Sequence, residues 1–304
     1  MSDSASFSGR DYAAALCVIL VWGTNFVAMK LALRELTPFQ LGAGRYLFAL
    51  LPLLLFVRPP AIAARWVLLY GLFQGVGQFG LLFLALRAGM SASLAPVVLQ
   101  MQVFFTAWFG SLVLGEKVGR SLLAAMAIAA LGLACFCTDI FQAGASGVTL
   151  AGFLLNVASA AMWATSNIVV RIARREAPQF DVLPFMVWSS MVPILPFALL
   201  SLAFDGPAAR LDWQAVSSTA WASTAYLGWF ATILGYALWT SLLKRHPANR
   251  VSPFGLAVPT VGIAAGMLGL GEVVTPWQWA GTFLVVLSLA LVLFGPRLRR
   301  AAPL

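Results

Sequence analysis

Ten long apolar runs dominate the sequence, and charged residues stand almost only at their ends. A bilayer core is crossed by roughly 20 apolar residues in a helix, which satisfies its own backbone polar groups. Hydrophobic residues make up 61% of the 304 residues and charged residues only 10%, which excludes a soluble domain of this length. We therefore predict an all-α integral membrane protein with ten transmembrane helices. The expected spans are 12–33, 39–57, 66–86, 91–114, 119–138, 149–170, 182–204, 215–243, 248–270 and 276–295.

The chain also repeats itself. Leu114-Gly115-Glu116 returns as Leu270-Gly271-Glu272, and Trp22-Gly23-Thr24 has a counterpart in Trp163-Ala164-Thr165. Each copy contains five apolar runs, so the second copy must enter the membrane from the opposite face. Inverted repeats of this kind are typical of transporters that work by alternating access.

The repeat divides the chain into two halves. We expect a first five-helix repeat at 1–138, a linker at 139–148 and a second five-helix repeat at 149–304. Their polar inward faces need one another to avoid lipid, so the halves should form one transmembrane unit that closes around a central cavity.

Basic residues are distributed unequally between the two expected faces. With the N-terminus in the cytoplasm, 14 of the 19 Lys and Arg residues fall on the cytoplasmic side and four on the other, and Arg45 lies within a span. This positive-inside bias predicts that both termini are cytoplasmic. It also explains the net charge of +9 without a nucleic-acid partner.

No acidic residue is expected at mid-membrane, which weakens a strongly ion-coupled mechanism and favours neutral or zwitterionic substrates. Glu116 and Glu272 occupy equivalent positions at the ends of the fourth and ninth spans. Each is either a gating or coupling site, or a cap for the helix that follows it. Arg45 is a third candidate for gating or coupling. A basic side chain there either neutralises a substrate carboxylate, pairs with helix carbonyls or snorkels to the interface.

Polar and aromatic side chains form stripes on several spans. Amides in hydrocarbon are costly unless they bond across helices or face a cavity. Each single amide is either helix glue or a ligand, but five such faces together favour a wet, aromatic-walled cavity. The stripes are Trp22, Asn25 and Met29; Gln74 and Gln78; Ser93, Gln100 and Gln102; Asn156, Ser159, Trp163 and Asn167; and Tyr226, Trp229, Tyr236 and Thr240.

Signatures of catalysis are missing. His246 is the single histidine and is expected in a cytoplasmic loop, and no nucleophile with a base, phosphate-binding loop or metal-spaced cluster appears. We predict no catalytic residues, no metal and no cofactor, so the protein is not expected to be an enzyme. A channel would usually show a ring built from several subunits, whereas inverted halves favour alternating access.

Several motifs resemble the EamA family of the drug/metabolite transporter superfamily along essentially all ten spans. The first is Trp22-Gly23-Thr24-Asn25-Phe26-Val27-Ala28-Met29-Lys30, followed by Gly44-Arg45-Tyr46, Val98-Leu99-Gln100-Met101-Gln102, Gly115-Glu116 and Ala231-Thr232-Ile233-Leu234-Gly235-Tyr236. The resemblance implies a ten-helix exporter of small metabolites in the bacterial inner membrane. It is nearest to exporters of amino acids and derivatives such as cysteine and O-acetylserine, with relatives that carry aromatic amino acids.

We therefore expect export of small neutral amino acids, aromatic ones included, and related metabolites by a protein that acts as a monomer. The alternatives are an exporter of hydrophobic drugs or amphiphiles, and a channel-like pore. The expected substrate-binding residues are Trp22, Asn25, Gln78, Gln100, Trp163, Asn167 and Tyr226.

Overall fold

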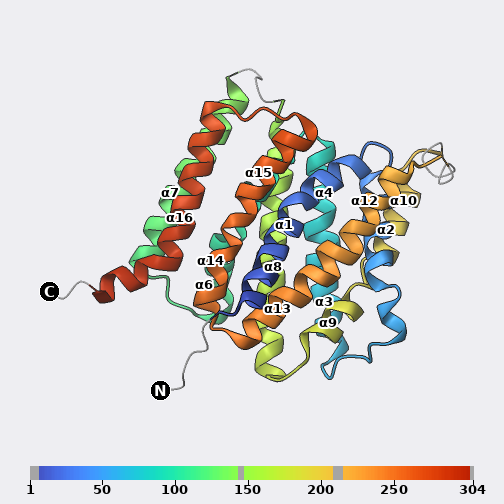
Figure 1. The fold of residues 1–304 in the computed structure, drawn as a ribbon, viewed down its shortest axis with the longest axis horizontal. Coiled ribbons are helices and arrows are strands. Elements are labelled where there is room, and N and C mark those ends of the chain that lie inside the picture. The colour runs from blue at the N-terminus through green and yellow to red at the C-terminus, as the bar shows by residue number, and fades with distance from the viewer. Residues whose placement is uncertain (1–6, 143–146, 208–214, 302–304) are drawn as a thin grey trace.

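The computed structural model describes residues 7–142, 147–207 and 215–301, and every regular element in these residues is a helix (Figure 1). In chain order they are α1 (Gly9–Ala32), α2 (Pro38–Leu50), η1 (Leu53–Leu55), α3 (Ala64–Tyr70), η2 (Gly71–Phe79), α4 (Gly80–Arg87), α5 (Ala95–Leu99), α6 (Gln102–Leu114), α7 (Arg120–Phe141), α8 (Leu150–Glu176), α9 (Val182–Ser189), α10 (Ile194–Phe204), α12 (Ser218–Ala225), η3 (Tyr226–Leu234), α13 (Gly235–Arg245), α14 (Ala248–Gly255), α15 (Ala257–Leu270) and α16 (Pro276–Ala301).

Consecutive helices join into longer stretches, and nine stretches within the described residues are long and apolar enough to cross a membrane. They make the chain a multi-pass membrane protein. The expected second span at 39–57 is different, because α2 ends after 13 residues at Leu50. The residue before a proline avoids the helical region, and Leu51, before Pro52, is extended at φ −95° and ψ 135°. A short 3₁₀ turn, η1, follows.

Two span boundaries also differ from those expected. The sixth span continues past 170 to Glu176, so Arg174 and Arg175 lie in the last turn of α8, where cations interact favourably with the helix dipole. The fifth span, α7, includes Asp139 and ends at Phe141, so the first three residues of the expected linker are helical.

Two nine-residue π-helical segments interrupt the third and eighth spans. They are η2, between α3 and α4, and η3, between α12 and α13. A π-helix has wider turns with i→i+5 bonding and is frequently found at functional sites. The eighth span, Ser218–Arg245, is long at 28 residues. The wider turns of η3 account for part of this length.

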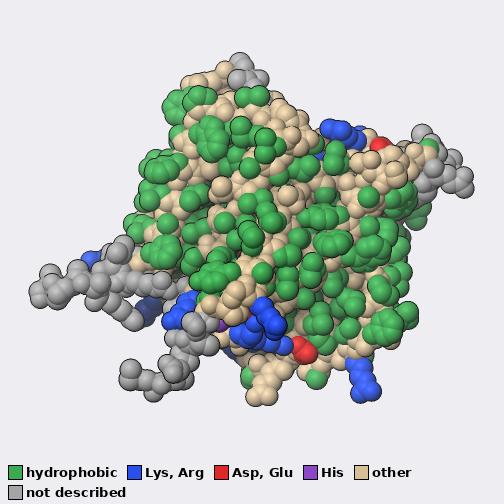
Figure 2. Space-filling view, in the orientation of Figure 1, with side chains coloured by type: hydrophobic (Ala, Val, Ile, Leu, Met, Phe, Trp, Pro, Cys, Tyr) green, Lys and Arg blue, Asp and Glu red, His purple; other side chains and the backbone are tan. Residues whose placement is uncertain are grey.

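The helices pack as one bundle with α1 near its centre (Figure 1). The α7 and α16 helices run side by side at one edge, and small residues allow this: a Cβ on Gly132 would lie 2.9 Å from the carbonyl oxygen of Gly281. We call the end of the bundle where α1 begins and α16 ends the terminal end, and the opposite end the distal end. Figure 2 shows Lys and Arg side chains gathered along the terminal end and apolar side chains over the middle of the same face.

Candidate functional site

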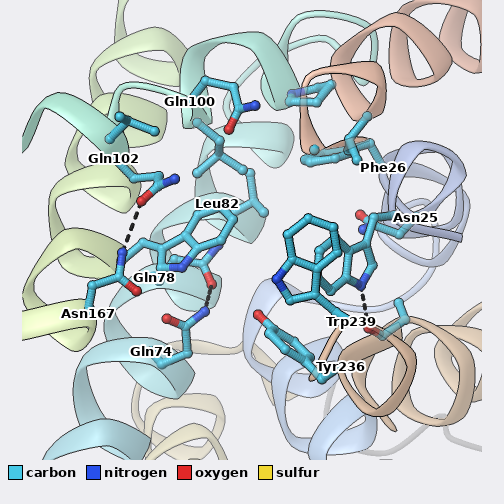
Figure 3. A pocket seen from close by; sticks show the side chains of 18 of the residues that line it. Asn25, Phe26, Gln74, Gln78, Leu82, Gln100, Gln102, Asn167, Tyr236 and Trp239 are labelled. Atoms are coloured by element: carbon cyan, nitrogen blue, oxygen red, sulfur yellow. Dashed lines mark hydrogen bonds between the residues drawn. The ribbon is translucent and has the colours of Figure 1, made fainter. Parts of the chain in front are cut away.

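A cavity of about 480 Å³ lies in the middle of the bundle (Figure 3). Small-molecule sites are typically concave, largely apolar and roughly 300 to 1,000 Å³ in volume. Side chains from both halves of the chain line it, and no carboxylate does so among the described residues. Six of the seven expected substrate-binding residues are among the lining: Trp22, Asn25, Gln78, Gln100, Trp163 and Asn167.

The cavity amides on η2 are bonded within the protein. Gln74 Nε2 donates to Gln78 Oε1 at 3.1 Å, and Ser166 Oγ of α8 donates to Gln74 Oε1 at 2.5 Å. Ser159 Oγ donates to the main-chain oxygen of Gln78 at 2.7 Å. These bonds connect the π-helical segment to α8, so Gln74 and Gln78 stabilise the packing of these helices and also line the cavity.

A second amide pair joins α8 to α6. Asn167 Nδ2 donates to Gln102 Oε1 at 3.0 Å and to Thr106 Oγ1 at 3.1 Å, as Figure 3 shows for the first of these bonds. Both donor hydrogens of Asn167 are therefore used inside the protein. Gln100, also in the lining, lies at the break between α5 and α6.

Aromatic rings build the opposite wall. The Trp22 ring lies 5.1 Å from Tyr236 and 5.6 Å from Trp239, measured between ring centres. Trp22 Nε1 donates to the carbonyl oxygen of Ala231 at 2.9 Å, so the indole is fixed against η3. The wall can therefore offer a rigid apolar surface to part of a ligand.

Tyr226 does not belong to the lining, although the stripe on the eighth span predicted it. Its hydroxyl bonds Thr24 Oγ1 at 2.7 Å and donates to the carbonyl oxygen of Val21 at 3.1 Å, between η3 and α1. Trp229 of the same stripe is 44% exposed on the outside of the bundle. The stripe was predicted from ordinary α-helical turns, and η3 has wider ones. Of the stripe, Tyr236, which follows η3, is the residue that lines the cavity.

Arg45 lines the cavity as a fully buried side chain, with 1% of its surface exposed. Snorkelling to the interface is therefore wrong for this residue. Its Nε and Nη2 donate to Thr232 Oγ1 at 3.2 and 3.0 Å, and its guanidinium lies 3.7 Å from the centre of the Phe79 ring. A hydroxyl and an aromatic face thus hold this charge in place.

The two candidate gating glutamates have different partners. Glu272 accepts from the backbone N–H groups of Ala92 and Ser93 at 2.8 and 2.7 Å and from Ser93 Oγ at 2.6 Å. Glu116 pairs with Arg171 at 2.6 Å on the surface. The capping alternative is wrong for Glu272, because Thr275 caps the helix that follows it by accepting from the N–H of Gln278.

Comparison with known proteins identifies the family. The model of the EamA-like transporter family matches residues 11–138 and again 150–294. The chain belongs to the EamA-like transporter family. This membership implies a membrane-embedded transporter with a small-molecule substrate, and it confirms the resemblance seen in the sequence motifs.

The curated relatives of this EamA-family chain include two proteins named "Probable amino-acid metabolite efflux pump". The one from Salmonella typhimurium (strain LT2) is 39% identical over 299 residues, which covers 97% of this chain and 98% of the relative. The one from Escherichia coli (strain K12) is 36% identical over 295 residues, with the same coverage. A solved crystal structure matches with a TM-score of 0.63 at 17% identity, over 97% of this chain and all of that one, and shows the fold alone.

Proposed function

We propose that this protein exports small neutral amino acids, aromatic ones included, and related metabolites across the bacterial inner membrane. The mechanism is alternating access between two inverted five-helix repeats, ten spans in all, with α2 and η1 as the second. The observation that carries the proposal is the central cavity, which combines indole rings, amides and one buried cation and has no carboxylate among its described lining. The names of the two similar efflux pumps support the substrate class.

Orientation in the membrane follows from charge, and the side from which substrate enters follows from the contacts at the distal end. The clustering of Lys and Arg at the terminal end supports cytoplasmic termini. At the distal end, the bonds from Ala92 and Ser93 to Glu272 join the turn before α5 to the corner after α15, which supports a state closed on the outer side. The cavity reaches toward the terminal end along α13, α14 and α16, where a cytoplasmic substrate would enter.

In this proposal the protein works as a monomer, because both halves of the cavity come from one chain. It needs no catalytic residue, metal or cofactor, and its partners are the substrate and the lipid bilayer. The absence of a cavity carboxylate in the described residues supports transport without a tightly built sodium or proton site.

The test is counterflow in proteoliposomes. Vesicles loaded with unlabelled phenylalanine or another neutral amino acid should take up the radiolabelled form transiently and saturably. A panel without accumulation of any neutral amino acid would overturn the proposal. Because much of the lining is apolar, export of hydrophobic drugs or amphiphiles is the second candidate, and it predicts drug resistance in cells without saturable amino-acid flux. Flux that rises without saturation would indicate a channel-like pore.

A further inference from the structure

Two polar atoms in the cavity wall are buried and have no hydrogen-bond partner. They are Arg45 Nη1 and Asn25 Oδ1. Buried polar groups are nearly always paired, so each such atom calls for an explanation. The other amides that face the cavity from η2 and α8 have bonds within the protein. Among the buried polar atoms of the described lining, these two are the ones that the protein leaves without a partner, and a ligand group could supply it.

Arg45 carries a positive charge that no carboxylate neutralises in the described part of the chain. The described acidic side chains are engaged elsewhere, for example Glu272 with Ser93 and Glu116 with Arg171. The residues described around the guanidinium supply neutral groups: the Thr232 hydroxyl, the face of the Phe79 ring and the nearby phenols of Tyr46 and Tyr236. A buried charge without a counter-ion is costly, and an anionic ligand group would remove that cost.

The contacts of Arg45 also orient it. Thr232 Oγ1 donates its own hydrogen to the carbonyl oxygen of Leu227, five residues earlier in η3, at 2.9 Å. Its lone pairs are then free to accept from Arg45 Nε and Nη2 on one side of the guanidinium. Because the plane is also stacked on Phe79, Nη1 is the nitrogen left to meet a ligand.

Asn25 offers the complementary group. It is 8% exposed on α1, and Figure 3 shows it in the wall formed by α1 beside the aromatic side chains. Its unpaired Oδ1 is an acceptor without charge. A neutral acceptor can bind an ammonium group without cancelling the attraction of Arg45 for an anion, as a carboxylate in its place would.

We propose that Arg45 and Asn25 form the recognition pair for a zwitterion, with Arg45 Nη1 on the carboxylate and Asn25 Oδ1 on the ammonium. This inference rests on the proposed function and narrows it. The ligand must carry both groups, so cationic amines are repelled by Arg45 and simple carboxylic acids leave Asn25 unpaired. Gln78 and Asn167, also expected to bind substrate, line the same cavity and position its wall through their bonds to Gln74 and Gln102.

The test compares three probes that differ in one group: phenylalanine, phenylalaninamide, which lacks the carboxylate, and N-acetylphenylalanine, which lacks the ammonium. Binding is followed by the fluorescence of the cavity tryptophans in detergent, and transport by inhibition of phenylalanine counterflow. For the native protein we expect each analogue to bind at least about tenfold more weakly than phenylalanine, since it leaves a buried partner unpaired.

Each substitution should change one of two affinity ratios, that of phenylalanine to phenylalaninamide or that of phenylalanine to N-acetylphenylalanine. Arg45→Gln is expected to weaken phenylalanine binding until phenylalaninamide binds equally well, while N-acetylphenylalanine stays disfavoured. Asn25→Leu should remove the discrimination against N-acetylphenylalanine alone. Arg45→Lys keeps the charge but loses the pair of hydrogen bonds to Thr232, so we expect a phenylalanine-to-phenylalaninamide ratio between those of the native protein and Arg45→Gln. Arg34→Gln, a change of an exposed arginine outside the cavity, is the matched control and should keep both ratios.

The outcomes separate the two proposals. If phenylalanine counterflow occurs but Arg45→Gln and Arg45→Lys leave the native phenylalaninamide ratio unchanged, the recognition pair is wrong and the exporter stands. If the native protein shows no counterflow of any neutral amino acid yet binds phenylalanine through Arg45, the exporter is wrong and the pair stands. A native protein that binds all three probes equally contradicts the pair without any variant.

Discussion

The two Leu-Gly-Glu corners have the same backbone and different partners. Gly115 and Gly271 both adopt the left-handed conformation, at φ 68° and 67° and ψ 22° in each. In both corners the N–H of the glutamate donates to the carbonyl oxygen six residues earlier, at 3.3 Å. Glu272 then bonds two backbone N–H groups and a hydroxyl at the distal end, whereas Glu116 pairs with the exposed Arg171.

The difference separates what the local sequence determines from what the conformation determines. The same three residues, with a central glycine that tolerates positive φ, build the corner twice. The carboxylate partner depends on which segment lies beside the corner. If the halves are inverted repeats that exchange conformations, Glu272 holds its corner closed in this state. Glu116 would then form the equivalent contacts in the opposite state.

The largest expected effect comes from removing the distal carboxylate. In Glu272→Ala the N–H groups of Ala92 and Ser93, both in buried residues, lose their acceptor, and we expect a loss of about 3 kcal/mol in unfolding free energy. Glu116→Ala, the matched change, breaks a surface ion pair with both side chains about 40% exposed and should cost less than about 1 kcal/mol. Thermal unfolding in detergent measures both, and equal losses would mean that the two corners are equivalent.

The second contrast adds one methyl group next to each corner. A Cβ on Gly266 would lie 2.7 Å from Glu272 Oε2 and 2.8 Å from the backbone nitrogen of Ser93, which cannot move easily. A Cβ on Gly110 would meet only the flexible ends of Glu116 and Arg171, at 2.9 and 3.2 Å. We expect Gly266→Ala to destabilise by about 2 kcal/mol, as overpacking does, and Gly110→Ala to be nearly neutral. A neutral Gly266→Ala would show that the distal contact is loose.

The third test should give equal effects. Gly115→Ala and Gly271→Ala each place a side chain at positive φ, where nothing lies within 4 Å of the added Cβ. Only backbone strain remains, and it costs about 1 to 2 kcal/mol. Unequal unfolding temperatures for the two variants would contradict the view that the corners share one locally determined backbone.

Residue periodicity located the spans and most of the cavity, including Gln74 and Gln78 of η2, but failed at the other π-helical segment, η3. The stripes on the first and sixth spans placed Trp22 and Asn167 in the wall because ordinary helical turns hold there, whereas Gln100 reaches the wall from the break between α5 and α6. On the eighth span η3 shifts the register, so Tyr226 bonds Thr24 instead. No single-residue signal marks a π segment, although η2 and η3 occur at corresponding places in the two halves.

The sequence also could not predict which residues bind the charged side chains. The sequence placed Arg45 within a span, but its bonds to Thr232 join residues 187 apart along the chain. In the same way Glu272 meets Ser93 from 179 residues away. Local pattern carries no information about such pairs, so the alternatives for both residues could be separated only by their tertiary contacts.

The smallest expected effect concerns Glu35, a distal carboxylate outside the spans. It tests whether the strength of the Glu272 corner comes from burial or from the bonds to backbone N–H groups alone. Glu35 accepts from Ser217 Oγ and from the Ser217 N–H, both at 2.6 Å, and these bonds hold the pKa of Glu35 below its ordinary value. Because the folded pKa is lowered, its stabilisation is present above the unfolded pKa of roughly 4.3 and is lost as pH falls through the folded pKa.

Glu35 is exposed, so Glu35→Gln should lower the unfolding temperature only slightly at neutral pH, and the difference from the native protein should vanish in acid. Unfolding temperatures of both proteins across an acid titration check this. If Glu35→Gln proved as damaging as Glu272→Ala, capping of backbone N–H groups by any distal carboxylate would be decisive. A small effect would instead assign the strength of the Glu272 corner to the burial of Ala92 and Ser93.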